Sequence, residues 1–225
     1  MMRSFEARGD CAVSDEPFYG AFLKTTQFEH PMGDEVMASM DCDWQSIKQT
    51  MNGPAPQKKP IWYQKHMPHE MTGPVSITDF PNHRHAFLIR DPARIVASYA
   101  RKRVSVTVDD IGYDRQLRYA EHVAEKTGKK PIVLDSSDIL FDPEAYMIAL
   151  CEALDISWTE KMLRWKPGYR ESDGAWAPHW YNRVIETTGF GDPEGPVPEL
   201  SDDGKHVTEE SRPFYEKLAG YKICL

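Results

Sequence analysis

Two stretches of the sequence each join a short apolar run to a helical segment that begins with Asp-Pro. They are "HAFLIRDPARIVASYARK" at residues 85–102 and "IVLDSSDILFDPEAYMIALCEALD" at residues 132–155. Proline suits the first position of a helix, and the aspartate before it can cap the helix. Parallel strands need crossover connections, which are usually helices. This alternation therefore predicts an α/β fold with a parallel sheet flanked by helices.

Local patterns place further elements along the chain. Four strands are expected within residues 11–17, 61–66, 85–89 and 129–140. Helices are expected at residues 1–9, 43–51, 109–128, 142–155 and 177–190, with Gly9 and Gly128 as C-terminal stops and Asp142 as an N-cap. Residues 191–206 are expected to form a loop.

The overall charge excludes some partners. A net charge of −8 repels nucleic acid and acidic membranes, so neither is expected as a partner. No apolar run approaches the roughly 20 residues of a membrane span. The four cysteines (Cys11, Cys42, Cys151 and Cys224) lie far apart without a CxxC pair. We therefore expect free thiols and a cytoplasmic protein.

The turn after residues 85–89 concentrates side chains that bind anions. Arg90 ends the apolar run, and Arg94 and Ser98 share one face of the helix that follows. Ligands of open parallel sheets collect beyond the carboxyl ends of the strands, where helix N-termini favour negative charge. These side chains could hold a phosphate, although surface pairing of Arg90 with a carboxylate explains it equally well from the pattern alone.

The segment "RDPARIVAS" resembles the 3′-phosphate-binding segment of sulfotransferases that use 3′-phosphoadenylyl sulfate as donor. That family has a P-loop-type α/β fold. The resemblance implies that Arg90 and Ser98 hold the 3′-phosphate of the donor, with Arg94 beside them. "SDEPF" and "IVLDSSDILFDPEAYMIALCEALDISW" are also similar to family segments. A single domain over residues 1–225 is expected, with residues 1–165 as the nucleotide-binding part and 166–225 as a helical and loop part.

The family's loop for the 5′-phosphosulfate group is missing from this sequence. "MMRSFEARG" resembles the helix that follows the loop, so the chain is expected to be a sulfotransferase fold truncated at its N-terminus. An omitted upstream segment and a true short relative both remain open. The family's glycine-containing basic motif near the C-terminus is not evident either.

Catalysis by such a family needs a base near the acceptor and positive charge near the leaving group. The resemblance places these functions in "YQKHMPHE", where we expect His66 to be the base, assisted by Lys65 or His69. Glu16 could instead be the base or could orient the histidine. Each also has an ordinary structural explanation, namely surface histidines, a solvated lysine and a carboxylate that caps a helix.

The resulting hypothesis is transfer of a sulfuryl group from 3′-phosphoadenylyl sulfate to a hydroxyl or amine of a small-molecule acceptor. One alternative is a nucleotide-binding or interaction protein that keeps the fold without turnover. Another is a different P-loop transferase such as a small-molecule kinase, against which the lack of GxxxxGK[ST] counts. No metal is expected, because no His and carboxylate set has ligand spacing. The identity of the acceptor and homo-oligomerisation are left open.

Overall fold

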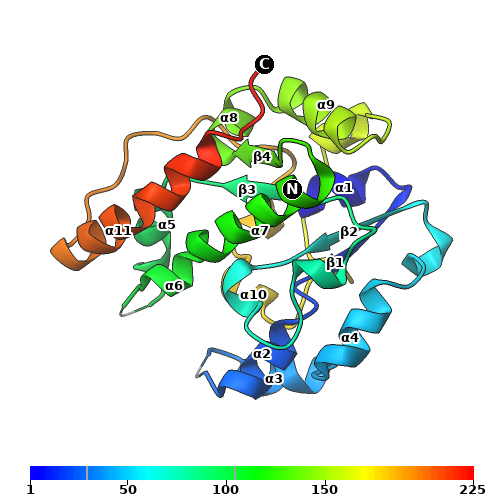
Figure 1. Ribbon diagram of the computed structural model, residues 1–225, viewed down its shortest axis with the longest axis horizontal. Coiled ribbons are helices and arrows are strands. Elements are labelled where there is room, and N and C mark those ends of the chain that lie inside the picture. The colour runs from blue at the N-terminus through cyan, green and yellow to red at the C-terminus, as the bar shows by residue number, and fades with distance from the viewer. Residues whose placement is uncertain (29, 104) are drawn as a thin grey trace. The chain divides into compact units, whose positions relative to one another are not determined.

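The computed structural model describes residues 1–28, 30–103 and 105–225, and it has the α/β organisation expected from the sequence (Figure 1). Strand β1 (Cys11–Asp15) pairs in parallel with β2 (Ile61–Lys65), and β3 (Ala86–Ile89) pairs in parallel with β4 (Ile132–Asp135). The fold class is confirmed. The helices are α1 (Met2–Ala7), α2 (Tyr19–Thr26), α3 (Gly33–Ser39), α4 (Trp44–Met51), α5 (Pro92–Tyr99), α6 (Val108–Ile111), α7 (Tyr113–Thr127), α8 (Ser136–Phe141), α9 (Pro143–Ala153), α10 (Ala177–Trp180) and α11 (Asp202–Ala219).

The chain divides into two compact units, each built from two separate segments. Unit 1 consists of Met1–Asn82 and Thr159–Phe190, and unit 2 consists of His83–Trp158 and Gly191–Leu225. Each unit contains one of the two strand pairs. The expectation of a single domain over residues 1–225 stays a prediction.

Unit 1 is built around the β1–β2 pair. Helix α1 packs on β1, and its Phe5 stacks on Tyr63 of β2 with ring centroids 4.5 Å apart. Helix α4 begins where sequence indicated, because Asp43 Oδ1 accepts hydrogen bonds from the backbone N–H groups of Gln45 and Ser46. These contacts fix the positions of β1 and β2, whose C-terminal ends carry Glu16 and Lys65.

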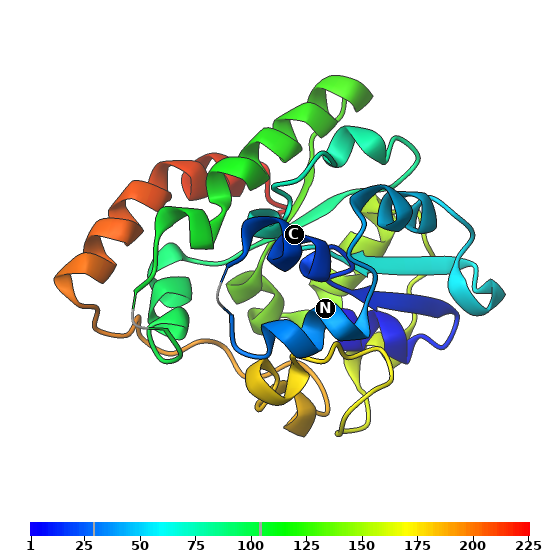
Figure 2. The ribbon, with the colours of Figure 1, turned by 90° about the horizontal axis from the view of Figure 1, so that it is seen from below.

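Unit 2 is built around the β3–β4 pair. Both Asp-Pro helix starts are confirmed, since Asp91 accepts from the N–H of Ala93 at 2.8 Å and Asp142 from that of Ala145 at 3.0 Å. Helix α11 runs beside α7 in both views (Figures 1 and 2) and also contacts α5. The turn after β3 is therefore held by a capped helix and by the C-terminal segment.

Two helix predictions and one loop prediction need correction. The helix expected at 109–128 is broken at Gly112, whose φ of +70° ends α6 before α7 begins. The helix expected at 177–190 stops at Trp180, because the residues near its end pair with an earlier segment: Trp165 N–H donates to Thr188 O at 3.0 Å. The loop expected at 191–206 ends at Ser201, whose side chain caps α11.

None of the helices in the described ranges combines the length and the apolar character that a membrane span requires.

Candidate functional site

Lys65 ends β2 and bonds to acidic side chains that follow β1. The parallel register pairs Lys65 with Asp15, so their side chains lie side by side. Lys65 Nζ donates to Asp15 Oδ1 at 2.9 Å and also to Glu16 Oε1. The Tyr181 hydroxyl accepts from Nζ at 2.9 Å and donates to Asp15 Oδ2. Two of the residues expected from sequence, Glu16 and Lys65, are thus in direct contact.

Glu70 is buried beside Glu16, and each of the two carboxyl groups shifts the pKa of the other. Two neighbouring buried carboxyl groups repel each other when both are ionised, so the pKa of at least one of them rises. Burial raises the pKa of Glu70 well above its usual range, and the negative charge of Glu16 adds to this effect. Burial also raises the pKa of Glu16, while the ammonium group of Lys65 opposes the rise. Glu70 is therefore the carboxyl group that holds its proton more tightly, while the ammonium group of Lys65 favours the ionised form of Glu16.

The central ammonium group stays charged. Burial alone would lower the pKa of Lys65, but attraction to Glu16 and Asp15 outweighs burial and raises the pKa well above its usual value. Burial raises the pKa of Tyr181, so its hydroxyl stays neutral. We call Asp15, Glu16, Lys65, Glu70 and Tyr181 the Lys65 cluster. It contains a fixed cation, a neutral donor and a carboxylate whose proton affinity is raised.

Glu16 has a strained backbone. Its φ is +47°, in the left-handed region that few side-chain-bearing residues adopt. The conformation is fixed on both sides, because Glu16 N–H donates to Lys65 O at 3.0 Å and Glu16 O accepts from the N–H of Tyr19 at 3.0 Å. Such strain costs about 1–3 kcal/mol and concentrates at functional sites. It turns the Glu16 carboxylate toward Lys65.

The two histidines predicted as site residues lie in different surroundings from each other. The His66 ring lies 5.7 Å from that of Phe18 and 6.3 Å from that of Phe80, measured between centroids. His69 Nε2 lies 4.0 Å from Glu70 Oε1, which brings His69 to the edge of the Lys65 cluster. The aromatic rings therefore lie beside His66, whereas Lys65 bonds to the acidic side chains that follow β1.

In unit 2, Arg90 and Arg94 bind the same carboxylate. Arg90 Nε donates to Glu194 Oε1 at 2.8 Å, and Arg94 Nε lies 3.3 Å from Glu194 Oε2. The Ser137 hydroxyl donates to Glu194 Oε2 at 3.2 Å. The Glu194 side chain is only 11% exposed. We call Arg90, Arg94, Ser137 and Glu194 the Arg90 cluster. It holds an anionic group between two guanidinium groups and a hydroxyl.

The backbone of Arg90 is fixed by Tyr113 at the start of α7. The Tyr113 hydroxyl accepts from the N–H of Arg90 at 2.7 Å and donates to the Arg90 carbonyl. Ser98 lies one helical turn after Arg94, with an exposed side chain whose hydroxyl has no hydrogen bond to any part of the chain that the structure describes. The structure therefore brings Arg90 and Arg94 together and leaves Ser98 outside their shared contact.

Five residues of the two clusters were not singled out from the sequence as site residues: Asp15, Glu70, Ser137, Tyr181 and Glu194. Asp15 precedes Glu16 and could have been included from that position. Tyr181 and Glu194 carry no local signal, because they lie 116 residues from Lys65 and 104 from Arg90. In the described ranges, no group of three or more His, Cys, Asp or Glu side chains has a metal-binding arrangement.

One family model and two plant proteins match the chain over most of its length. A family model described as Sulfotransferase domain matches residues 1–221. The chain is 32% identical over 195 residues to Branched-chain-amino-acid aminotransferase-like protein 2 of Arabidopsis thaliana, covering 86% of this chain and 34% of that protein. It is 31% identical over 222 residues to Branched-chain-amino-acid aminotransferase-like protein 1 of the same plant, covering 98% and 39%. The chain thus spans little more than a third of the length of these relatives.

Two solved structures also resemble the chain. They are the Sulfotransferase Domain from the Curacin Biosynthetic Pathway, with 12% identity, a TM-score of 0.44 and coverage of 86% of this chain and 77% of that one, and the Sulfotransferase Domain from the Synechococcus PCC 7002 Olefin Synthase, with 12% identity, a TM-score of 0.38 and coverage of 86% and 74%. The family is established by the model that covers residues 1–221. This chain belongs to the sulfotransferase domain family.

Proposed function

We propose that this chain transfers a sulfuryl group from 3′-phosphoadenylyl sulfate to a hydroxyl or amine of a small-molecule acceptor. In this proposal Arg90, Arg94 and Ser98 bind the 3′-phosphate of the donor, and the Lys65 cluster with His66 and His69 provides acid–base chemistry. Family membership supports the reaction class.

The observation that carries the proposal is the contact of two arginines with the Glu194 carboxylate. The carboxylate is an anionic group with oxygen acceptors, so it stands in for two oxygens of a phosphate. Guanidinium groups suit this geometry, because their planar N–H groups form paired hydrogen bonds with oxyanions. Ser137 adds a third donor at 3.2 Å. The residues present therefore fit a phosphate group, provided that Glu194 withdraws.

The Lys65 cluster supports the acid–base part. The acceptor oxygen or nitrogen forms a bond to sulfur, the bond between sulfur and the phosphate oxygen breaks, and adenosine 3′,5′-bisphosphate leaves. The proton lost by the acceptor needs a base. Glu16 is the better candidate among the residues considered, because burial raises its pKa and Lys65 keeps it ionised. His66 remains the alternative base, and in this proposal His69 assists by orienting Glu70, whose Oε1 lies 4.0 Å from His69 Nε2.

Nucleotide binding is tested first by thermal unfolding. Adenosine 3′,5′-bisphosphate at about 100 times its dissociation constant adds roughly 2.7 kcal/mol, which raises the Tm of a chain of this size by about 5–10 °C. Adenosine 5′-monophosphate should give a much smaller rise. Arg90→Ala should abolish the difference between the two nucleotides. Arg118→Ala should keep it, because Arg118 is exposed and pairs with Asp114 on α7. A wild-type protein that responds equally to both nucleotides contradicts the 3′-phosphate assignment.

Turnover is tested with 3′-phosphoadenylyl sulfate that carries labelled sulfur and a panel of hydroxyl and amine acceptors. Label should appear on an acceptor with the wild type, whereas Glu16→Gln should bind the bisphosphate normally and transfer no label. Binding without transfer in the wild type, across the panel, favours the nucleotide-binding protein without turnover. A strict requirement for magnesium favours the kinase alternative.

A further inference from the structure

Unit 1 contains a cavity of about 450 Å³ that shares no residue with the Lys65 cluster. One side is formed by α1, and the other by residues after the 3-10 turn Glu160–Leu163. Its polar lining consists of Arg3, Glu6, Arg164, Trp165, Lys166 and Arg170. Pockets that bind small organic ligands generally have volumes of about 300–1,000 Å³. The size therefore suits a ligand larger than a single inorganic ion.

The charge of this cavity is opposite to that of the chain. Four cationic side chains line it against one carboxylate, Glu6, in a chain with a net charge of −8. A concentration of one charge in a concave site attracts ligands of the opposite sign. The cavity therefore favours an anion.

Some of this positive charge is neutralised within the protein. Arg3 Nη2 donates to Asp173 Oδ2 at 2.7 Å, so one cation has its own counterion. Glu6 Oε2 lies 3.6 Å from Arg3 Nη1 and 3.4 Å from Arg170 Nε, and Glu6 Oε1 accepts from Ser172 at 2.7 Å. Arg3 and Arg170, the two least exposed arginines of the cavity, therefore have counterions within the protein.

Hydrogen-bonding capacity is left over at the same place. Arg3 is 5% exposed, yet its Nη1 has no hydrogen-bond partner within the described residues, and neither has the buried Nε of Arg170. Arg164 and Lys166 are exposed, and their side chains form no ion pair with any part of the chain that the structure describes. Arg164 and Lys166 therefore add two positive charges without a counterion among the described residues, whereas the buried nitrogens of Arg3 and Arg170 face only the Glu6 carboxylate, beyond hydrogen-bond geometry.

An aromatic wall adjoins these cations. Trp165 lines the cavity, its Nε1 donates to Thr187 Oγ1 at 3.0 Å, and its ring lies edge-on to Phe190 at 5.4 Å between centroids. These contacts hold the indole in place. A fixed aromatic side chain beside the cations suits a ligand that has an organic part as well as a charged group.

We propose that this cavity is a binding site for a phosphate monoester of a small organic molecule. Arg164 and Lys166 together supply two positive charges, and a phosphate monoester carries about −1.5 to −2 near neutral pH, whereas a single carboxylate or sulfate ester carries only one negative charge. The remaining volume and Trp165 receive the organic part. The site is separate from the proposed donor and acceptor chemistry.

The test is isothermal titration of the whole chain with glucose 6-phosphate, inorganic phosphate and glucose, at a constant ionic strength of about 0.15 M. Glucose 6-phosphate should bind saturably and more tightly than inorganic phosphate, and glucose should not bind. Arg164→Gln with Lys166→Gln should weaken binding at least about tenfold, because each charge-assisted hydrogen bond contributes more than a neutral one. Neither side chain forms an ion pair with a described residue, so the variant should fold normally.

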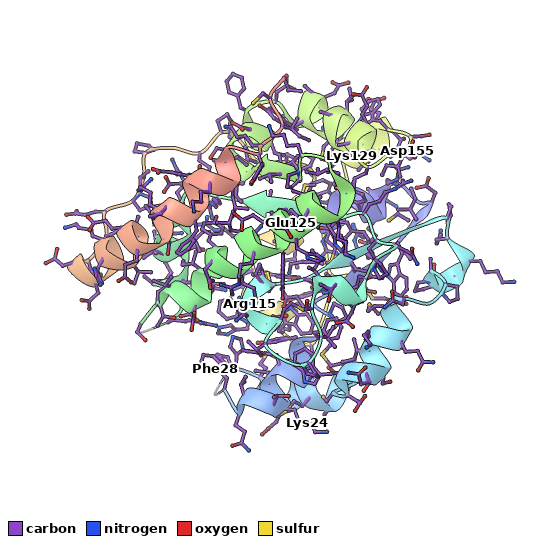
Figure 3. The ribbon with its side chains drawn as sticks, viewed as in Figure 1. Lys24, Phe28, Arg115, Glu125, Lys129 and Asp155 are labelled. Atoms are coloured by element: carbon purple, nitrogen blue, oxygen red, sulfur yellow. The ribbon has the colours of Figure 1, made fainter. Side chains whose placement is uncertain are left out.

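A matched control separates local contacts from overall charge. Lys126→Gln with Lys129→Gln also removes two positive charges, but from unit 2. Lys126 lies at the end of α7 and Lys129 just after it, as labelled in Figure 3. This control and Arg90→Ala should bind glucose 6-phosphate within about twofold of the wild type. Four results overturn the proposal: no saturable binding to the wild type, equal loss in both charge variants, loss with Arg90→Ala alone, and an affinity for inorganic phosphate or glucose that equals that for the ester.

Discussion

Replacing Lys65 with methionine should destabilise unit 1 strongly and in a pH-dependent manner. The substitution removes the ammonium group that lies 2.9 Å from Asp15 Oδ1 and also bonds Glu16. The Asp15 side chain is 1% exposed and that of Glu16 is 10% exposed, so two carboxylates would remain buried without their cation. Breaking a buried ion pair from one side costs about 3–5 kcal/mol. That loss corresponds to a drop in Tm of about 6–20 °C for a chain of this length.

The free energy of unfolding should be measured by urea titration, followed by tryptophan fluorescence. This signal reports mainly unit 1, which contains five of the six tryptophans: Trp44, Trp62, Trp165, Trp176 and Trp180. Lys48→Met is the matched control. The Lys48 ammonium pairs with Asp79 at 3.3 Å, and the two side chains are 30% and 27% exposed. An ion pair with this exposure contributes about 0–1 kcal/mol, so the control should lose no more than that.

The loss in Lys65→Met should be larger at about pH 8 than at about pH 5.5. Without the cation, the folded state holds protons on the buried carboxyl groups more tightly than the unfolded chain does. Stability of the variant is therefore regained as the pH falls toward the ordinary carboxyl pKa. A Lys65→Met variant that is unfolded at about pH 8 and folded at about pH 5.5 would also support this pH dependence. An equal loss at both pH values, or a loss no larger than that of Lys48→Met, would refute the role assigned to Lys65.

Three further outcomes are expected. The folded pKa of Glu70 lies above the ordinary value of 4.5, so the stability that its proton supplies is present below that value and is lost as pH rises through the folded pKa. In urea unfolding, the free energy of unfolding of Glu70→Gln should therefore rise relative to that of the wild type as pH rises, by at most about 1.4 kcal/mol per pH unit. Parallel pH profiles of the two proteins would contradict this. Glu194→Gln should bind adenosine 3′,5′-bisphosphate roughly tenfold more tightly in calorimetry, since the competing charge is gone, and an unchanged dissociation constant would mean that the carboxylate does not compete. Gly73→Ala should lose about 1–3 kcal/mol in urea unfolding, because the added Cβ would lie 2.3 Å from the buried Trp44 ring. The Cβ added by Gly33→Ala meets no atom of the described residues within 4 Å, so this control should be neutral or slightly stabilising.

Sequence predicted the elements whose signals are local. The runs that became β1, β2, β3 and β4 are short, apolar and bounded by turn residues, and the Asp91 and Asp142 caps lie beside the helices they start. Helix α11 was missed because it contains Gly204 early and Pro213 in its middle, which are both signals against a helix. Its stability comes from packing on α5 and α7, which no local pattern records.

The candidate site was predictable to a similar extent. Arg90 and Lys65 could be identified because each charged residue ends an apolar strand. Their main partners could not be identified, because Glu194 lies in an irregular segment and Tyr181 follows a helix of one turn. Contacts of this kind depend on where distant loops meet after folding. The identity of the base stays a prediction: the sequence favours His66 and leaves Glu16 as the alternative, and our proposal prefers Glu16.

The interleaving of the two units also bears on how the protein is made. Unit 1 needs residues up to Phe190, so it cannot be complete while the ribosome is still translating the first segment of unit 2. That segment, His83–Trp158, has been synthesised before the second half of unit 1 exists, and it must wait in turn for Gly191–Leu225. Neither unit can be expressed by shortening the gene at a single boundary. A separate unit 1 would need a designed linker that joins Asn82 to Thr159.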